Sequence, residues 1–400
     1  MKGTPLASVV PSDKSPTVQL YGLDLLRFLA AILVMVYHLT YDTWADPRLR
    51  RTDGGITFGV YRYLEQYTGS GWIGVQIFFV ISGFVIAYSA NGKDAWNYGA
   101  SRFLRLVPGL WVCAIVSLPF LIVSGVPLSR MAISFVNTLL IQPFGPHVSS
   151  AFWTLPIEIA FYATMSLLII IGKFQRIQTY GIVLGSISSL FWMLHVFLDD
   201  KLGLRHVVFG MNPATQLLLF QHGCFFALGI LMWLGTQVGW NLIRMTGCAC
   251  LMITGVVAIF GEVDKSYLWT SIRHSPLVPT TIWLGALVTI FISATYNIHV
   301  VRLIGNQKRI VKVLGLTTYP LYLIHQPVGI WLAYSCLKRG IEPLPSLIIA
   351  SVASIGIAIW VATVLEPRLR GWMSSWLNHI RSKLPAESIL FRKGKLVELG

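Results

Sequence analysis

The segment Gly22-Leu-Asp-Leu-Leu-Arg-Phe-Leu-Ala-Ala-Ile-Leu-Val-Met-Val-Tyr-His-Leu-Thr-Tyr-Asp-Thr43 is long and apolar enough to cross a bilayer as a helix, yet it carries four ionisable side chains. Charge inside a bilayer is costly and therefore usually marks function. Arg27 and His38 are eleven residues apart, which at about 100° per residue places them on nearly the same helix face, roughly 16 Å apart along the axis. Asp24 lies one turn before Arg27. Asp42 lies one turn after His38, so each basic side chain has a carboxylate at helical-neighbour spacing.

The composition excludes an ordinary soluble domain. The chain has 400 residues, of which 55% are hydrophobic and only 12% are charged, and its mean hydropathy is +0.67. Soluble proteins are near one quarter charged. Apolar windows of about 20 residues recur along the chain and predict an all-α, polytopic membrane helical bundle of about ten transmembrane helices. The predicted spans lie at about 22–42, 71–90, 108–126, 152–172, 178–198, 212–234, 241–261, 277–297, 314–337 and 344–365.

The basic residues indicate the orientation of the bundle. If the N-terminus is cytosolic, 20 of the 31 Lys and Arg residues fall on inner segments, and the positive-inside rule then favours both termini in the cytosol. We therefore predict a disordered cytosolic leader over residues 1–21, a transmembrane domain over 22–366 and a basic cytosolic tail over 367–400. The net charge of +15 resides mostly in loops and in the tail. We expect contacts with anionic membrane lipids and none with nucleic acid.

His38 is the first candidate catalytic residue. At about 1.5 Å per residue it lies near the outer leaflet, and Asp42 can fix its tautomer and stabilise its imidazolium, as a general base requires. The alternative is a neutral histidine bonded to a backbone carbonyl. Glu158 enters the membrane from the opposite side and is predicted at a similar height, about 9 Å below the outer edge. Its alternative role is a helix-start carboxylate after Pro156, favoured by the helix dipole.

Three arginines are predicted near the cytosolic edge of the bundle. Arg102 and Arg105 are three residues apart and share a helix face, and Arg27 lies at a similar depth. A cluster of guanidinium groups has the forked donors that suit phosphate binding. The alternatives are ordinary positive-inside anchoring for Arg102 and Arg105, and an ion pair with Asp24 for Arg27.

Two further segments are candidate cavity walls. Residues 71–85 contain Ser82 and several glycines, for which close helix packing is favoured over approach of a ligand. Residues 314–327 contain two prolines that loosen the helix near mid-membrane, and a helix broken at that depth usually lines a cavity. We assign five residues to a substrate cavity, with His325 favoured as part of its wall over a direct catalytic role: Ser82, Trp153, Tyr319, Tyr322 and His325. The five cysteines show no metal or disulfide spacing, and we predict no metal site.

Five blocks of the sequence resemble, in order, the acyltransferase-3 family of membrane O-acyltransferases. They are Arg27 with His38 after ten intervening residues, residues 71–84 with a Gly-Val-x-x-Phe-Phe-Val-x-Ser-Gly-Phe run, Arg102-x-x-Arg105, residues 152–162 with a Trp-Ser/Thr-Leu-x-x-Glu-x-x-Phe-Tyr run, and 319–327. The resemblance extends from residue 22 to about 367. It implies transfer of an acyl group, usually acetyl, from cytosolic acyl-CoA to a hydroxyl of an extracytoplasmic glycan or lipid-linked saccharide.

The resemblance also implies roles for single residues. His38 matches the essential histidine of the family, Arg27 its basic partner, and Arg102 and Arg105 the pair that engages coenzyme A. Acyl-CoA is then a co-substrate, and no permanently bound cofactor is expected. Some family members carry a fused periplasmic domain, which we do not expect here because only about 35 residues follow the last predicted span.

Several alternatives stay open at this point. His38 acts either as a general base or as a transient acyl carrier, and the role of Glu158 and the acceptor are undetermined. A proton-coupled transporter or flippase of a glycan or small anion would also have a charged lining, although the sequence shows no internal repeat. A signalling or scaffold protein is a third possibility. The expected location is the bacterial inner membrane.

Overall fold

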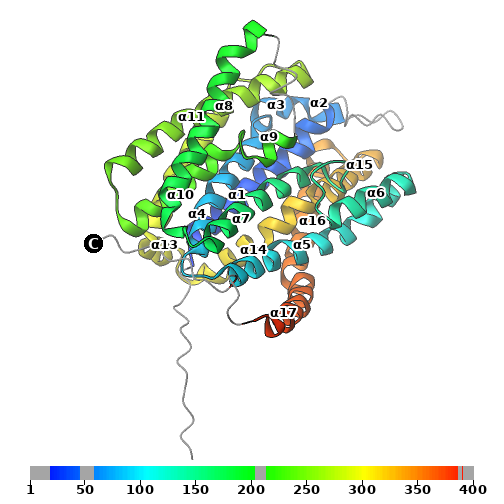
Figure 1. Cartoon of the computed structure of the whole chain (residues 1–400). Helices are drawn as coiled ribbons and strands as arrows, with labels where there is room; N and C mark the ends of the chain where they lie inside the picture. The colour runs from blue at the N-terminus through cyan, green and yellow to red at the C-terminus, as the bar shows by residue number, and fades with distance from the viewer. Residues whose placement is uncertain (1–18, 46–57, 203–212, 386–389, 391–400) are drawn as a thin grey trace, which may run out of the picture.

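The computed structural model describes residues 19–45, 58–202, 213–385 and 390, which fold almost entirely into helices and contain no strand (Figure 1). Eight helical stretches in these ranges are long and apolar enough to cross a membrane. The prediction of an all-α polytopic bundle is therefore confirmed. The eight stretches are Tyr21–Ala45, Gly71–Ala90, Ala95–Val123, Ser150–Ile170, Phe174–Phe197, Leu242–Leu268, Leu277–Thr295 and Pro343–Lys383.

The two other predicted spans are helical as well. Residues 212–234 correspond to the short α9 (Pro213–Leu217) and to α10 (Gly223–Val238), which is buried along most of its length and packs against α4, α8 and α11. Residues 314–337 lie in one helical path made of α14 (Lys308–Ile324), the π-helical turn η9 (His325–Ile330) and α15 (Trp331–Lys338).

The remaining long helices are α4 (Gly74–Ala90), α7 (Thr154–Ile170), α8 (Ile177–Leu202), α11 (Leu242–Thr270), α12 (Leu277–Thr295) and α16 (Pro343–Trp360). Short helical segments connect them. These are η3 (Phe58–Leu64), α3 (Glu65–Thr68), η4 (Gly71–Ile73), η5 (Ser150–Trp153), η6 (Phe174–Arg176), α13 (Asn297–Ile304) and η8 (Gly305–Gln307).

The segment with the four ionisable side chains, residues 22–43, lies within one continuous helical stretch of the bundle. This stretch comprises α1 (Tyr21–Tyr37), the π-helical turn η1 (His38–Asp42) and α2 (Thr43–Ala45), and α1 packs against α4, α12 and α14. Small residues allow the close contact with α4, because a Cβ atom on Gly74 would lie 2.5 Å from the Ala30 carbonyl oxygen. A Cβ atom on Gly83 would likewise collide with the Phe226 carbonyl of α10. The packing role favoured for these glycines is therefore confirmed.

The third predicted span begins too late. Helix α5 (Ala95–Val123) starts thirteen residues before position 108 and runs through both Pro108 and Pro119. Its start is fixed by Asp94, whose Oδ1 accepts a hydrogen bond of 2.7 Å from the backbone N–H of Asn97. The polar residues of its first half lower the hydropathy there and hide the helix from a hydropathy window. Helix α6 (Leu128–Leu139) packs against α5 and, at 12 residues, is too short to span a bilayer.

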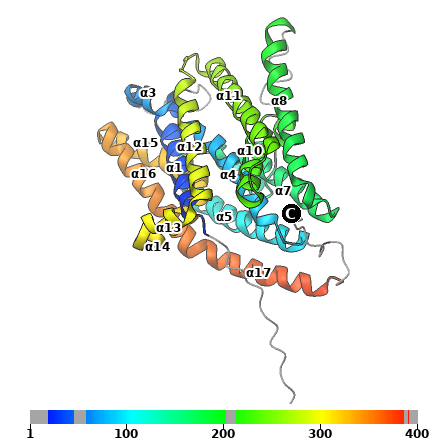
Figure 2. The same cartoon turned by 90° about the vertical axis from the view of Figure 1, so that its left-hand side faces the viewer.

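The basic tail begins as a helix that lies across one end of the bundle. Helix α16 continues through the π-helical turn η10 (Val361–Leu365) into α17 (Glu366–Lys383), which crosses the end where α1 begins (Figure 2). Arg381 Nη1 donates a 3.0 Å hydrogen bond to Asn97 Oδ1 at the start of α5. We call this end, with α13 and α17, the basal end, and the opposite end, with α2 and α3, the distal end (Figure 1). The predicted leader lies outside the described residues except at 19–21.

Candidate active site

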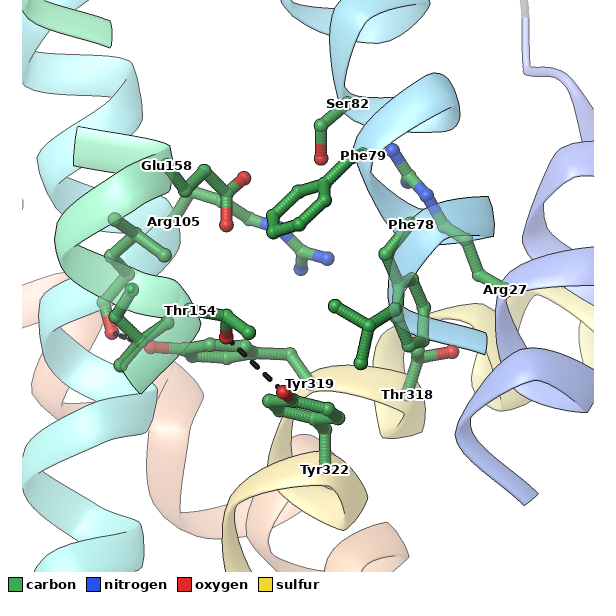
Figure 3. A pocket seen from close by; sticks show the side chains of 13 residues that line it. Arg27, Phe78, Phe79, Ser82, Arg105, Thr154, Glu158, Thr318, Tyr319 and Tyr322 are labelled. Atoms are coloured by element: carbon green, nitrogen blue, oxygen red, sulfur yellow. Dashed lines mark hydrogen bonds between the residues drawn. The ribbon is translucent and has the colours of Figure 1, made fainter. Parts of the chain in front are cut away.

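A pocket lies between α1, α4, α5, α7 and α14 (Figure 3). It brings together six residues that the sequence assigned to the site from five separate segments: Arg27, Ser82, Arg105, Glu158, Tyr319 and Tyr322. Arg27 enters from α1 on one side, while Arg105 and Glu158 face it from α5 and α7 (Figure 3). The rest of the wall is largely apolar: Val75, Phe78, Phe79, Leu106, Thr154, Leu155 and Thr318.

The arginines near this pocket are supported by aromatic rings. Arg105 Cζ lies 5.8 Å from the centre of the Tyr319 ring. Arg102 lies outside the pocket lining, 6.0 Å from the Tyr98 ring and 5.7 Å from the Tyr162 ring. No carboxylate oxygen of the described residues lies within 4.0 Å of Arg27, Arg102 or Arg105. Cation–π support of this kind leaves the N–H donors of a guanidinium available to an anion.

The arginine cluster does not contain the ion pair considered for Arg27. Asp24 Oδ2 accepts a hydrogen bond of 2.5 Å from Gln19 Nε2 and lies more than 4.0 Å from the Arg27 guanidinium. Arg102 is partly buried, and its Nε has no hydrogen-bond partner in the described chain. A buried donor without a partner is unfavourable, so binding of acceptor oxygens beside the three arginines would be stabilising.

Glu158 belongs to the arginine pocket. It accepts a 2.5 Å hydrogen bond from the Tyr162 hydroxyl one turn further along α7, and it lines the same pocket as Arg27 and Arg105. His38 does not line this pocket. The similar height in the bilayer that was predicted for Glu158 and His38 therefore does not place the two residues in one pocket. The alternative of a helix-start carboxylate is wrong, because Glu158 is the fifth residue of α7 and the first turn has no acidic residue.

Tyr322 connects the pocket to a second group of polar residues. Thr154 Oγ1 donates a 3.2 Å hydrogen bond to its hydroxyl (Figure 3), and the Phe78 ring packs edge-on against it with centroids 5.7 Å apart. The ring of His325 is 6.0 Å from the ring of Tyr322, one turn further along the chain. Tyr322 therefore has the arginine pocket on one side and His325 on the other.

His325 is in direct contact with His38. Its Nε2 lies 3.2 Å from His38 Nδ1, and the ring centroids are 5.0 Å apart. His38 Nδ1 also lies 2.9 Å from the carbonyl oxygen of Val34. A carbonyl oxygen can only accept, so Nδ1 of His38 carries the hydrogen and Nε2 presents a lone pair. That is the tautomer of a general base acting through Nε2.

Asp42 stands in a different relation to His38 from the one predicted. Its Oδ2 lies 3.7 Å from Nε2, the nitrogen that presents the lone pair, which is too far for a hydrogen bond. Nδ1, the nitrogen that sets the tautomer, is engaged by other groups. Asp42 is placed to stabilise an imidazolium once Nε2 has taken a proton.

Gln326 is a site residue that the sequence analysis missed. Its Oε1 accepts hydrogen bonds of 2.6 Å from Ser149 Oγ, 2.9 Å from Ser150 Oγ and 3.3 Å from the N–H of Ala151. These bonds tie the turn that carries His325 to the segment that leads into α7. A buried amide beside a histidine in an apolar run was the available signal. Trp153 lies outside the pocket lining and packs instead against Phe79 and His222.

Comparison with known proteins decides the family. The chain matches the acyltransferase domain of the acyltransferase-3 family over residues 20–363. It belongs to this family. The resemblance noted in the sequence is thereby confirmed, and the chain is a multi-pass membrane protein of this family. No group of three metal-ligating side chains capable of holding a metal occurs in the part of the chain that the structure describes.

Two curated relatives illustrate the family. O-acetyltransferase OatA of Staphylococcus aureus is 25% identical over 343 residues, which cover 77% of this chain and 50% of OatA. Nodulation protein 10 of Rhizobium leguminosarum bv. viciae is 25% identical over 260 residues, which cover 57% of this chain and 68% of that protein. The chain thus spans about half the length of OatA. No solved structure matches it significantly.

Proposed function

We propose that this acyltransferase moves an acyl group, usually acetyl, from cytosolic acyl-CoA to a hydroxyl of an extracytoplasmic glycan or lipid-linked saccharide. The observation that carries the proposal is the continuity between two chemically different groups of residues. Guanidinium groups without close carboxylates lie in and beside the pocket, and Tyr322 links that pocket to His325 and His38. An acyl-CoA has the matching polarity, with phosphates at one end of a long arm and a thioester at the other.

The donor end of the proposal rests on charge. Coenzyme A carries several phosphate charges, and burying them beside an apolar bundle requires cationic partners. Arg27 and Arg105 line the pocket, and Arg102 lies within reach of Tyr98 and Tyr162 on the same helix face as Arg105. Arginine forks bind phosphate oxygens in pairs, which fixes the orientation of the donor as well as its affinity.

His38 then acts on the acceptor. Its Nε2 lone pair takes the proton of the attacking hydroxyl, the hydroxyl oxygen forms a bond to the thioester carbonyl carbon, and the carbon–sulfur bond breaks. The proton passes from Nε2 to the departing CoA thiolate, so the products are an ester and CoA. Asp42, 3.7 Å from Nε2, stabilises the intermediate imidazolium. General-base catalysis of this kind contributes about 10²–10⁴-fold, and positioning must supply the rest.

A variant of this mechanism has His38 accept the acyl group before passing it to the acceptor. Brief incubation with radiolabelled acetyl-CoA without acceptor, followed by rapid quenching, separates the two. Label on the wild-type protein that is absent from the His38→Ala protein would favour the acyl-carrier route. Absence of label on protein that transfers normally favours direct attack.

The central test is the His38→Ala variant, expressed in the source organism in place of the native protein. We expect loss of the base-labile acetyl esters that the wild type adds to surface glycans, while the amount of inserted protein stays the same. His299→Ala is the matched control, because this histidine is exposed on α13. Normal acetylation by correctly inserted His38→Ala protein would refute the proposal.

A further inference from the structure

Both histidines stand at the first residue of a π-helical turn. Turn η1 begins at His38 and turn η9 begins at His325, and the two turns contact each other. A π-helical turn inserts one extra residue into a helix, changes the direction of the side chains around it and is frequent at functional sites. Two such turns meeting at a pair of histidines indicate that the backbone is shaped to bring the imidazoles together.

The hydrogen bonds of the pair have a single direction. His325 Nδ1 lies 3.1 Å from the Leu321 carbonyl oxygen, so Nδ1 carries the hydrogen and Nε2 is an acceptor. His38 Nδ1, 3.2 Å from that Nε2, carries a hydrogen because it also faces the Val34 carbonyl. The single Nδ1 hydrogen of His38 is therefore shared between the Val34 carbonyl, at 2.9 Å, and His325 Nε2, at 3.2 Å. His325 Nδ1–H donates in turn to the Leu321 carbonyl, and the lone pair of His38 Nε2 faces away from His325.

We propose that His325 is a positioning residue that holds His38 in its base-competent tautomer and orientation, and that strengthens its hydrogen bond to His38 when the imidazolium forms. The inference rests on the proposed role of His38. Val34 belongs to the same helix as His38 and follows its movements, whereas His325 comes from a different helix and restrains the ring from outside. A hydrogen bond from a cationic donor is shorter and stronger than one from a neutral donor, so the contact favours the protonated intermediate.

His325 is itself well fixed and is not placed to act as the base. It is 0% exposed, and both ring nitrogens are engaged. Its neighbour Gln326 is bonded to Ser149 and Ser150, which anchors turn η9 to the start of α7. The side chain of His38, in contrast, is 15% exposed. A group that is locked by its surroundings and reaches the reactive group through one hydrogen bond can orient that group accurately.

Two amide substitutions at position 325 provide a matched test. In glutamine the amide atoms are as many bonds from Cβ as Nε2 is in histidine, so His325→Gln can still offer an acceptor to His38. In asparagine the amide atoms are as many bonds from Cβ as Nδ1 is in histidine. His325→Asn can therefore keep the contact with Leu321 but cannot reach His38. We expect kcat to fall about 10-fold to 100-fold for asparagine, the size of effect typical of a lost supporting contact. Glutamine should recover most of this loss.

The measurement uses the full-length chain in washed membranes of the source organism, with each variant replacing the native copy and radiolabelled acetyl-CoA as the donor. Base-labile label in the glycan fraction gives kcat and the KM for acetyl-CoA, normalised to inserted protein. The KM should stay within about twofold for both variants, because the effect acts on the chemical step. Equal activity of His325→Gln and His325→Asn, or a change confined to KM, would overturn the proposal.

A double-mutant comparison separates this inference from the proposed function. If His325 acts only through His38, adding His325→Asn to His38→Ala causes no further loss of the residual rate. If His38→Ala keeps the wild-type rate, the proposed function itself fails. If His38→Ala is inactive while His325→Asn matches the wild type, only the positioning role of His325 is refuted.

Discussion

At the scale of single residues, Arg105 is the side chain whose contribution to donor binding can be isolated. It lines the pocket, stacks on Tyr319 and has no carboxylate of the described chain within 4.0 Å. Its guanidinium therefore has no close ion pair among the described residues. Because a guanidinium fork binds phosphate oxygens in pairs, the residue should affect donor affinity more than the chemical step.

We expect Arg105→Gln to raise the KM for acetyl-CoA about 10-fold or more, since a hydrogen bond to a charged group contributes about 1.5–3 kcal/mol. The KM of Arg105→Lys should lie between those of the wild type and Arg105→Gln, because lysine keeps the positive charge but loses the paired N–H donors of the guanidinium. Initial rates over a range of acetyl-CoA concentrations give the answer. Arg130→Gln is the control, since Arg130 is exposed on α6. An unchanged KM for Arg105→Gln would remove this residue from the donor site.

The sequence predicted the residues of the site better than it predicted their neighbours. Arg27 and His38 were related by helix periodicity, which is a local property, and the structure places both on one continuous helical stretch, Tyr21–Ala45. The contact between His38 and His325 joins positions 287 residues apart, and residue counting yields height in the bilayer but not which helices are adjacent. For the same reason Glu158 was expected at a height similar to that of His38 with its neighbours left open, and the structure places it in a pocket with Arg27 and Arg105.

At the scale of elements, the turn that carries His38 and Asp42 is held from the distal end of the bundle. Tyr41, within η1, has its hydroxyl 2.8 Å from Nε2 of His274, which lies in the segment between α11 and α12. The same Nε2 is 4.0 Å from Glu65 Oε1 on α3. Burial lowers the pKa of His274 below its ordinary value, and the Glu65 carboxylate raises it in part. A neutral His274 is thus part of the support of turn η1.

This contact predicts a pH dependence of stability. Because the pKa of His274 is lower in the folded protein than in the unfolded chain, the unfolded chain binds more protons as the pH falls through about 6.5, and stability decreases toward acid. Thermal unfolding in detergent at pH values of about 7.5 and 5.5 should show this decrease for the wild type. His274→Gln can keep the contact with Tyr41 and does not titrate, so the thermal stability of this variant should decrease less between the two pH values. Equal decreases in the wild type and the variant would exclude His274 as the source of the pH dependence.

Each of the ten apolar windows corresponds to helix in the structure, because the segments that a bilayer would accept also form the bundle. The polar helix α17 has no such window. The windows failed at the start of α5, where polar residues lower the hydropathy of a helix that begins after the Asp94 cap. They could not indicate η1 or η9 either. A π-helical turn adds one residue to a helix without changing its composition, so neither hydropathy nor periodicity reveals it.

At the scale of the whole molecule, the proposed function requires a particular orientation in the membrane. Arg27 lies in the second turn of α1, which begins at the basal end, and Arg102 and Arg105 lie in the first half of α5. His38 directly follows α1 and precedes α2, which is at the distal end, and His325 contacts His38. Acyl-CoA is made in the cytosol. The basal end must therefore face the cytosol, which is also the side on which the positive-inside rule puts the basic helix α17.

Cysteine labelling tests this orientation directly. Cys250 is the exposed cysteine, and the other four are buried. A Cys250→Ser variant therefore has no exposed native cysteine that a maleimide could label. In intact spheroplasts a membrane-impermeant maleimide should label Tyr67→Cys, a position 75% exposed on α3 at the distal end. It should label His379→Cys, exposed on α17 at the basal end, only after lysis. The reverse pattern would open the arginine pocket toward the side without acyl-CoA, and the donor, the direction of transfer and the role of the arginines would all have to be reassigned.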